Sequence, residues 1–150
     1  MQRTAQAQWR GDLRSGSGQI SVASRTLSNT PYSFVSRFEH GQGTNPEELL
    51  AAAHAGCFTM AVSAQLTKAG LKPESLETTC TITLSQQDGG FAITESHLEL
   101  HAKVPGVTQD AFDRAVQEAK SGCPVSKLYK TNITLDAHLE STSAHGSSPA

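Results

Sequence analysis

Apolar and polar residues alternate along much of this chain, which is the pattern of β-strands with one covered face. The stretches predicted as strands are 4–9, 18–25, 31–39, 78–84, 91–104 and 132–139. In the third of them, Phe34 and Phe38 fall on one face and Arg37 falls on the opposite face. Asp88-Gly89-Gly90 separates the fourth stretch from the fifth and predicts a hairpin turn.

Two further stretches have the spacing of α-helices. Thr44 or Asn45 can cap the first helix, and Pro46 suits its first turn. Its body at 49–66 is apolar on almost every side, and a helix without a polar face is typically buried. The second helix is predicted at 108–121, where apolar residues recur every three or four positions.

The predicted order of elements is βββ-α-ββ-α-β, which is an α+β fold. The 150 residues suit one domain, which we place at 1–140, followed by a small, polar and flexible tail at 141–150. Hydrophobic residues make up only 37% of the chain and aromatic residues 5%. Such a lean supply of core material suggests that two copies of the chain share one core.

The net charge of −2, with no run of lysine or arginine, argues against nucleic acid or an anionic membrane as a partner. Residues 1–12 lack the apolar stretch of a signal peptide. The charge-free run at 49–67 contains polar residues and predicts a buried helix rather than a membrane span. The three cysteines follow no disulfide-framework pattern, which fits a reducing compartment, and we expect a cytoplasmic protein.

Cys57 lies inside the apolar helix, in the stretch AAAHAGCFTMAVSA, and two interpretations of it stay open. A free cysteine is among the most often buried residue types, so Cys57 can be a plain core residue. It can also be a reactive thiol. However, it lies about three turns into the helix, too far for the helix dipole to lower its pKa. A reactive Cys57 therefore requires a nearby cation.

Cys123 lies beside Pro124, where one helical pattern ends and another begins. Backbone N–H groups and a helix N-terminus at such a place stabilise a thiolate, so on local grounds Cys123 can be the more acidic thiol. It can equally be a capping or packing residue.

Arg37 is the best candidate for the cation that Cys57 needs, although a solvated strand residue is the simpler interpretation. Glu47 lies in the first turn of the helix, where a carboxylate is favoured by the dipole. It lies ten residues before Cys57, which is about 15 Å along the helix axis, so the two cannot meet within one helix. They could meet if two copies of this helix packed antiparallel in a dimer.

His54 and Cys57 are three residues apart on one helix face, a spacing that could bind a metal together with Cys123. Cys80 alternates with Ile82 and Leu84 and is expected in the core. The chain contains no phosphate loop or dinucleotide motif, and we expect neither a bound cofactor nor a metal.

Residues 44–58, Thr-Asn-Pro-Glu-Glu-Leu-Leu-Ala-Ala-Ala-His-Ala-Gly-Cys-Phe, resemble the signature of the OsmC/Ohr family of osmotically inducible and organic-hydroperoxide-resistance proteins. Gly-Cys-Pro-Val-Ser at 122–126 is similar to the second cysteine motif of the family, and the likeness extends over about residues 3 to 140. The details resemble the OsmC branch, because His54 stands where the Ohr branch usually has tyrosine and Arg37 comes just before the helix.

This resemblance implies an intertwined homodimer with antiparallel sheets around two central helices. It implies a cysteine-based peroxidase in which Cys57 is the peroxidatic thiol and Cys123 the resolving thiol, with Arg37 and Glu47 as the polar pair that activates Cys57. The implied substrates are organic hydroperoxides and hydrogen peroxide. The implied reductant is an external dithiol, with a dihydrolipoyl protein as one candidate.

Two other functions remain open on the residues alone. The apolar helix could line a dimer cleft that binds a hydrophobic ligand without catalysis, with the cysteines only packing. The chain could also be a metalloprotein that uses His54, Cys57 and Cys123.

Overall fold

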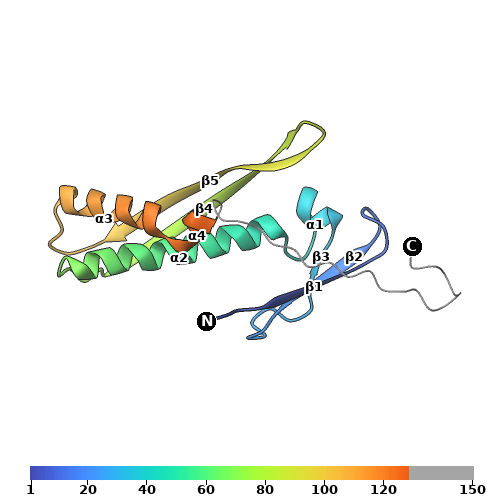
Figure 1. Cartoon of the computed structure of the whole chain (residues 1–150), viewed down its shortest axis with the longest axis horizontal. Coiled ribbons are helices and arrows are strands. Elements are labelled where there is room, and N and C mark those ends of the chain that lie inside the picture. The colour runs from blue at the N-terminus through green and yellow to red at the C-terminus, as the bar shows by residue number, and fades with distance from the viewer. Residues whose placement is uncertain (129–150) are drawn as a thin grey trace, which may run out of the picture.

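The structure, a computed structural model, describes residues 1–128 and has an α+β fold with antiparallel sheets (Figure 1). The elements in chain order are β1 (Ala5–Arg10), β2 (Ser17–Val22), β3 (Thr30–Tyr32), α1 (Phe34–Phe38), α2 (Pro46–Lys68), β4 (Ser75–Gln87), β5 (Gly90–Lys103), α3 (Gln109–Gly122) and α4 (Pro124–Leu128). The strand predicted at 132–139 and the tail predicted at 141–150 lie outside the described residues.

The predicted α+β class is confirmed, and so are four of the strands and both helices, with ends shifted by a few residues. The hairpin turn predicted between β4 and β5 is also confirmed. Asp88 and Gly89 both adopt positive φ there, at 46° and 81°, which these residue types tolerate. The two sheets are β1-β2-β3 and β4-β5.

The strand predicted at 31–39 is wrong beyond its first residues. β3 ends at Tyr32, and α1 follows it immediately. Ser33 caps this helix, because its hydroxyl accepts from the Ser36 N–H while the Ser36 hydroxyl accepts from the Ser33 N–H. Phe34 and Phe38 therefore share a face as neighbours one helical turn apart, and their rings lie 4.9 Å apart. Alternation and helical spacing both place these two residues together, so the apolar pattern alone could not distinguish the two structures.

Helix α2 begins as predicted. The Asn45 side chain accepts from the Glu48 N–H at 2.7 Å, and Pro46 occupies the first turn. The expectation that α2 is buried on all sides is wrong for a single chain. Only a stripe of residues four apart is buried, namely His54, Phe58, Val62 and Leu66. The opposite side is open, and Met60 is 77% exposed.

The hydrophobic core lies between α2, α3 and the β4-β5 hairpin. Figure 1 shows the two helices side by side along the hairpin. The most deeply buried residues of the core are Val62, Leu66 and Cys123, and alternate residues of the hairpin such as Leu98 and Leu100 pack against them. We refer to residues 46–128 as the helix–hairpin core. By length and composition α2 could cross a membrane, but its packing against β4 and α3 fits the central helix of a soluble protein.

We refer to residues 5–38, from β1 to α1, as the N-terminal arm. The arm lies to one side of the helix–hairpin core in Figure 1, and none of the buried hydrophobic residues of the described chain comes from it. Its sheet is held by aromatic packing over Gly18, which pairs with both Trp9 and Tyr32. These two rings lie 5.4 Å apart across the missing side chain.

Candidate functional site

Cys57 and Cys123, 66 positions apart in the chain, bring their sulfur atoms to 2.7 Å from each other. Cys57 comes from the middle of α2. Cys123 follows the last turn of α3, where it caps that helix and is fully buried. The packing of α3 and α4 on α2 therefore creates the pair. Both thiols are free, as is that of Cys80.

The two thiols have different electrostatic surroundings. Burial raises the pKa of Cys57, and the hydrogen bond with Cys123 raises it further, while the Val125 N–H acts in the opposite direction. Burial also acts to raise the pKa of Cys123. There it is outweighed by hydrogen bonds from Cys57, from the N–H groups of Ser126 and Val125, and from the Ser126 hydroxyl, so the pKa of Cys123 is lowered. Within one chain, Cys123 is the more acidic thiol.

Arg37 and Glu47 form the second pair of the site. The guanidinium donates two parallel hydrogen bonds of 3.0 Å, from Nε and from one terminal nitrogen, to the two carboxylate oxygens. The Glu47 side chain is 12% exposed, so the carboxylate needs this partner more than a surface carboxylate would. The Arg37 guanidinium also lies 5.1 Å above the Phe38 ring.

Local hydrogen bonds fix α1 against the start of α2 and so set the position of Arg37. The Ser36 hydroxyl donates to the Thr44 carbonyl, and the Asn45 amide donates to the Ser36 carbonyl. Gly43 allows this approach, since it has a φ of 103° and a side chain there would collide with the Pro31 carbonyl.

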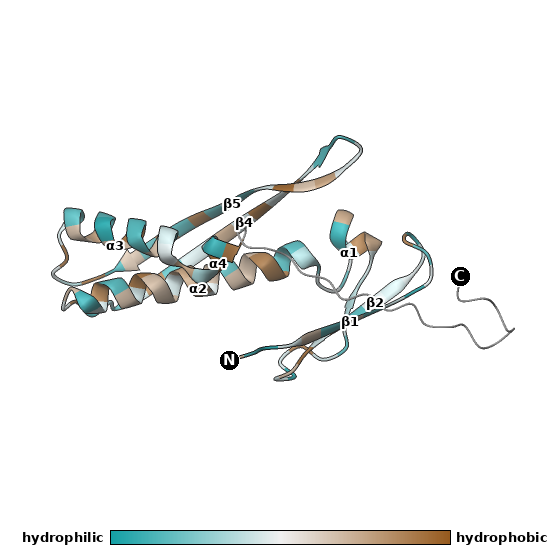
Figure 2. Cartoon of the chain, in the orientation of Figure 1, coloured by the Kyte–Doolittle hydropathy of each residue, from teal (hydrophilic) through white to brown (hydrophobic). Residues whose placement is uncertain are grey.

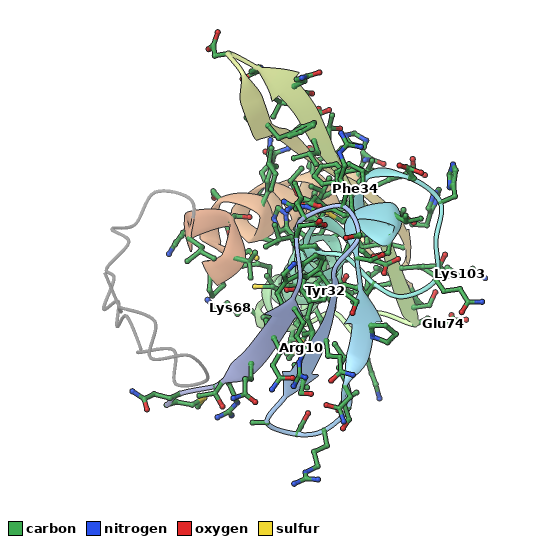
Figure 3. The ribbon with its side chains drawn as sticks, turned by 90° about the vertical axis from the view of Figure 1, so that its right-hand side faces the viewer. Arg10, Tyr32, Phe34, Lys68, Glu74 and Lys103 are labelled. Carbon is green, nitrogen blue, oxygen red and sulfur yellow. The ribbon has the colours of Figure 1, made fainter. Side chains whose placement is uncertain are left out.

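Beside Arg37 the arm forms an aromatic cleft of about 240 Å³, which the sequence did not reveal. Its lining consists of Trp9, Leu13, Tyr32, Ser33, Phe34, Arg37 and Phe38. Figure 3 views the molecule from the side of the arm and labels Tyr32 and Phe34 near the middle of the view. Phe58, the aromatic residue next to Cys57, is buried in the helix–hairpin core and does not line this cleft. The clustering of aromatic residues at 32–38 is the signal that could have indicated the cleft.

His54 is buried and binds two hydroxyl groups. Its Nδ1 lies 2.6 Å from the Ser96 Oγ and its Nε2 lies 2.8 Å from the Ser126 Oγ. Burial lowers the pKa of His54, which favours the neutral ring. Both nitrogens are thus occupied, and no cluster of three or more potential metal ligands occurs within residues 1–128. This geometry does not favour the metal site considered for His54, Cys57 and Cys123.

The four predicted site residues thus form two pairs, Cys57 with Cys123 and Arg37 with Glu47. Nothing cationic is among the groups that shift the pKa of Cys57 in the described part of the chain. Glu47 and Cys57 are on the same straight helix, about 15 Å apart along its axis.

Comparison with known proteins adds an independent line of information. A family model described as OsmC-like protein matches residues 39–138. Peroxiredoxin OsmC of Escherichia coli (strain K12) is 48% identical over 139 residues, which cover 93% of this chain and 97% of that protein. An organic hydroperoxide resistance protein of Xanthomonas axonopodis pv. citri is 36% identical over 100 residues, which cover 66% of this chain and 68% of that protein.

Solved structures agree with the sequence comparisons. The crystal structure of an organic hydroperoxide resistance protein from Elizabethkingia anophelis matches with a TM-score of 0.64 and 25% identity. The match covers 88% of this chain and 91% of that one.

Proposed function

Because this chain belongs to the OsmC-like protein family, we propose that it reduces organic hydroperoxides with Cys57 as the peroxidatic thiol and Cys123 as the resolving thiol. Similarity to Peroxiredoxin OsmC makes the chain a cysteine-based peroxidase, an antioxidant oxidoreductase of the stress response. The observation that carries the assignment of residues is the 2.7 Å between the two sulfur atoms.

The reaction begins when the Cys57 thiolate attacks the distal oxygen of the hydroperoxide. An S–O bond forms, the O–O bond breaks, and the alcohol leaves, so that Cys57 becomes a sulfenic acid. The Cys123 sulfur then displaces the hydroxyl group, which forms the Cys57–Cys123 disulfide and releases water. An external dithiol, with a dihydrolipoyl protein as one candidate, restores both thiols by thiol–disulfide exchange. We place this chemistry in the cytoplasm.

Arg37 supplies the positive charge that Cys57 needs. Burial and Cys123 both raise the pKa of Cys57, so without a cation this thiol is protonated at neutral pH. A guanidinium beside the sulfur favours the thiolate, and Glu47 holds that guanidinium in a bidentate ion pair. The same charge assists the leaving oxygen of the peroxide.

A second copy of the chain brings the two pairs together in this proposal. Glu47 lies in the first turn of α2, about three turns from Cys57 of the same helix, and its ion pair holds Arg37 of α1 beside it. Two α2 helices packed antiparallel place the Arg37–Glu47 pair of one copy beside Cys57 of the other. The exposed apolar residues of α2, such as Met60, and the lack of a buried core in the arm both support such a homodimer. Figure 2 shows that apolar residues occur along much of α2.

The aromatic cleft beside Arg37 suits the organic part of a hydroperoxide. Its aromatic rings offer apolar surface, while the guanidinium at its edge can meet the polar peroxide group. Hydrogen peroxide has no apolar part to occupy the cleft, so we propose that it is accepted but gains nothing from these rings.

The test is a pair of heterodimers, each purified through a different tag on each chain. The first combines Arg37→Ala with Cys57→Ser, and the second combines wild type with the Arg37→Ala/Cys57→Ser double variant. If Arg37 serves the partner's Cys57, the first heterodimer has one intact site and about half of the wild-type activity, and the second has none. If Arg37 serves its own chain, the two results are exchanged.

The homodimeric variants set the scale of this test. Cys57→Ser lowers hydroperoxide turnover to background, and Arg37→Ala lowers it about 100-fold, the usual cost of removing one preorganised electrostatic group. Arg10→Ala is the matched control on exposed β1 and retains activity. Full turnover by Arg37→Ala would contradict the role of Arg37, and failure to recover any heterodimer would contradict the dimer.

A further inference from the structure

Two contacts tie the segment that follows α3 to the middle of α2, and they have the same spacing on both sides. His54 and Cys57 lie three residues apart on one face of α2. Cys123 and Ser126 are also three residues apart, across the start of α4. The Cys57 sulfur lies 2.7 Å from that of Cys123, and the Nε2 of His54 lies 2.8 Å from the Ser126 Oγ. The imidazole contact is therefore a second link beside the sulfur pair.

The His54 ring is also held from its other side. Its Nδ1 lies 2.6 Å from the Ser96 Oγ of β5, and the residue is only 5% exposed. A neutral imidazole donates from one nitrogen and accepts at the other, and each serine hydroxyl can take the complementary role. Both ends of the ring are thus occupied, and Nε2 stays directed at α4. We refer to Ser96, His54 and Ser126 as the histidine clamp.

Few contacts hold α4 in place. It has five residues, and a helix of that length is not stable by itself in water. Pro124 at its start has no N–H, so α4 does not simply continue α3. Val125 packs against the hydrophobic core. Among residues 1–128, the His54–Ser126 contact is the only hydrogen bond that joins a side chain of α4 to another helix or strand.

The position of α4 in turn affects where the Cys123 sulfur lies. On one side, the N–H of Cys123 donates to the Ala119 carbonyl, which fixes it to the end of α3. On the other side, its carbonyl accepts from the Lys127 N–H of α4 at 3.1 Å. Its ψ of 126°, the extended value that a following proline favours, turns the chain out of α3. A shift of α4 therefore moves Cys123 and changes the distance between the two sulfur atoms.

The resolving step depends on that distance. In this step an S–S bond forms and the Cys57 S–O bond breaks. The Cys123 sulfur is oxidised, the Cys57 sulfur is reduced, and the hydroxyl group leaves as water with the Cys123 thiol proton. The competing reaction is attack of the Cys57 sulfenic acid on a second hydroperoxide, which gives sulfinic acid. Holding two groups together accelerates their reaction with each other but not with a reagent from solution.

We propose that His54 is a positioning residue for the resolving step, because the histidine clamp holds α4 so that Cys123 stays beside Cys57. The inference rests on the proposed peroxidase cycle and adds to it what decides between resolution and overoxidation. The clamp sets the hydroperoxide concentration that the enzyme tolerates before Cys57 is lost as sulfinic acid. It takes no part in the first step, the attack of Cys57 on the peroxide.

A single-turnover experiment on the full-length protein measures both steps. Reduced protein is mixed with tert-butyl hydroperoxide over a range of concentrations, quenched with a thiol-blocking reagent, and analysed by mass spectrometry for disulfide and sulfinic acid. His54→Phe keeps a buried ring but removes the hydrogen bonds of the clamp. It is expected to consume the first equivalent of peroxide at the wild-type rate and to form the disulfide about 10-fold more slowly, the effect of one lost hydrogen bond. Sulfinic acid then appears at about 10-fold lower peroxide concentration.

Further variants locate the effect. Ser126→Ala is expected to act as His54→Phe does, and Ser126→Thr restores the rate because it keeps the hydroxyl. The double variant His54→Phe/Ser126→Ala should be no slower than either single variant, since both remove the same contact. If His54→Phe does not fold, the two Ser126 variants decide the question.

Thr59→Val is the matched control. It removes a different hydrogen bond of α2, that of the Thr59 hydroxyl to the Thr78 hydroxyl of β4 at 2.7 Å, which does not lead to α4. The variant loses a contact of the same kind from the same helix, so it controls for a general loss of stability. It is expected to form the disulfide at the wild-type rate.

The reduction potential of the Cys57–Cys123 disulfide provides a readout that a general loss of stability would not change. Thiols held together have a high effective concentration for each other, which favours their disulfide. In His54→Phe and Ser126→Ala the potential, measured by equilibration with reduced and oxidised dithiothreitol, should become about 30 mV more positive. This shift is a 10-fold smaller equilibrium constant for a two-electron couple. Thr59→Val should keep the wild-type potential.

Three outcomes would overturn the proposal: an unchanged disulfide rate in His54→Phe and Ser126→Ala, an unchanged potential in both, or an equal loss in Thr59→Val. Failure of the peroxidase cycle itself is recognised separately. The wild-type protein would then consume no hydroperoxide, while the potential of its disulfide can still be measured against dithiothreitol.

Discussion

The helix–hairpin core and the N-terminal arm differ in what one chain can complete by itself. The helix–hairpin core contains every buried hydrophobic residue of the described chain, and it brings Cys57 and Cys123 into contact. The arm has paired strands, packed aromatic rings and an anchored Arg37, but it buries no hydrophobic side chain of its own. In the proposed homodimer each chain therefore supplies half of a site, its own sulfur pair to one site and its arginine to the other.

This division has a physical reason. Covering apolar surface stabilises a fold in proportion to the area removed from water. Within residues 1–128, the three short strands of the arm have no second layer to cover them. The arm and the open side of α2 can both be covered by a second copy. The same contact would bring the arginine of one copy to the thiol of the other, so that assembly and activation of Cys57 become one event.

The largest contrast between the two regions is expected in stability. Leu66→Ala removes a fully buried side chain from the helix–hairpin core and should lower the free energy of unfolding by about 2–5 kcal/mol. The matched substitution in the arm, Leu13→Ala, removes a side chain that is 63% exposed in one chain and should change it by less than about 0.5 kcal/mol. Urea unfolding at one fixed protein concentration measures both, and equal losses would contradict the division into core and arm.

A smaller effect is expected on the KM for a bulky hydroperoxide, and it comes from the arm. Phe34→Ala removes an aromatic wall of the cleft and should raise the KM for a bulky aryl hydroperoxide about 10-fold, since one lost apolar contact in a pocket costs 1–3 kcal/mol. The KM for hydrogen peroxide should not change. Val35→Ala, on the same short helix but outside the cleft, is the control. Steady-state kinetics with both peroxides measure the two KM values. An unchanged KM for the aryl hydroperoxide in Phe34→Ala would contradict a role for the cleft.

The smallest expected effect is on the pH dependence of the free energy of unfolding, and it comes from the helix–hairpin core. The folded protein lowers the pKa of His54 through burial, so the neutral ring is favoured by folding. This contribution to stability is complete above pH 6.5, the ordinary value, and is lost as the pH falls through the lowered pKa of the folded state. Unfolding measured between pH 7 and pH 5 should show a loss of stability that His54→Gln reduces, whereas the arm variant Leu13→Ala should follow the wild-type pH dependence.

Much of the fold was accessible from patterns within short segments. The N-cap of α2, the hairpin turn at Asp88 and the alternation in four of the strands are local, and each was predicted correctly. The segment from Tyr32 to Phe38 failed because alternation and helical spacing coincide at Phe34 and Phe38. There the hydroxyls of Ser33 and Ser36 decide in favour of a helix. The division into a domain at 1–140 and a tail at 141–150 stays a prediction.

The candidate site shows the same limit. Two cysteine motifs were visible in the sequence, and so was the likeness to a peroxidase family that the comparisons bear out. The sequence alone also showed that Glu47 and Cys57 are too far apart along one helix to meet within it. The contacts of His54 with Ser96 and Ser126 were not visible, because residues 42 and 72 positions away supply them.

The sequence by itself determined the elements, the two thiols and the family, because capping, periodicity and motif spacing act over a few residues. Only the tertiary structure decided that the pKa of Cys123 is lowered while that of Cys57 is raised, that aromatic rings line the cleft beside Arg37, and that the buried His54 lies between the Ser96 and Ser126 hydroxyls. These features depend on which distant side chains share a dry interior, where burial and hydrogen bonds act strongly, and that is fixed by packing rather than by local pattern.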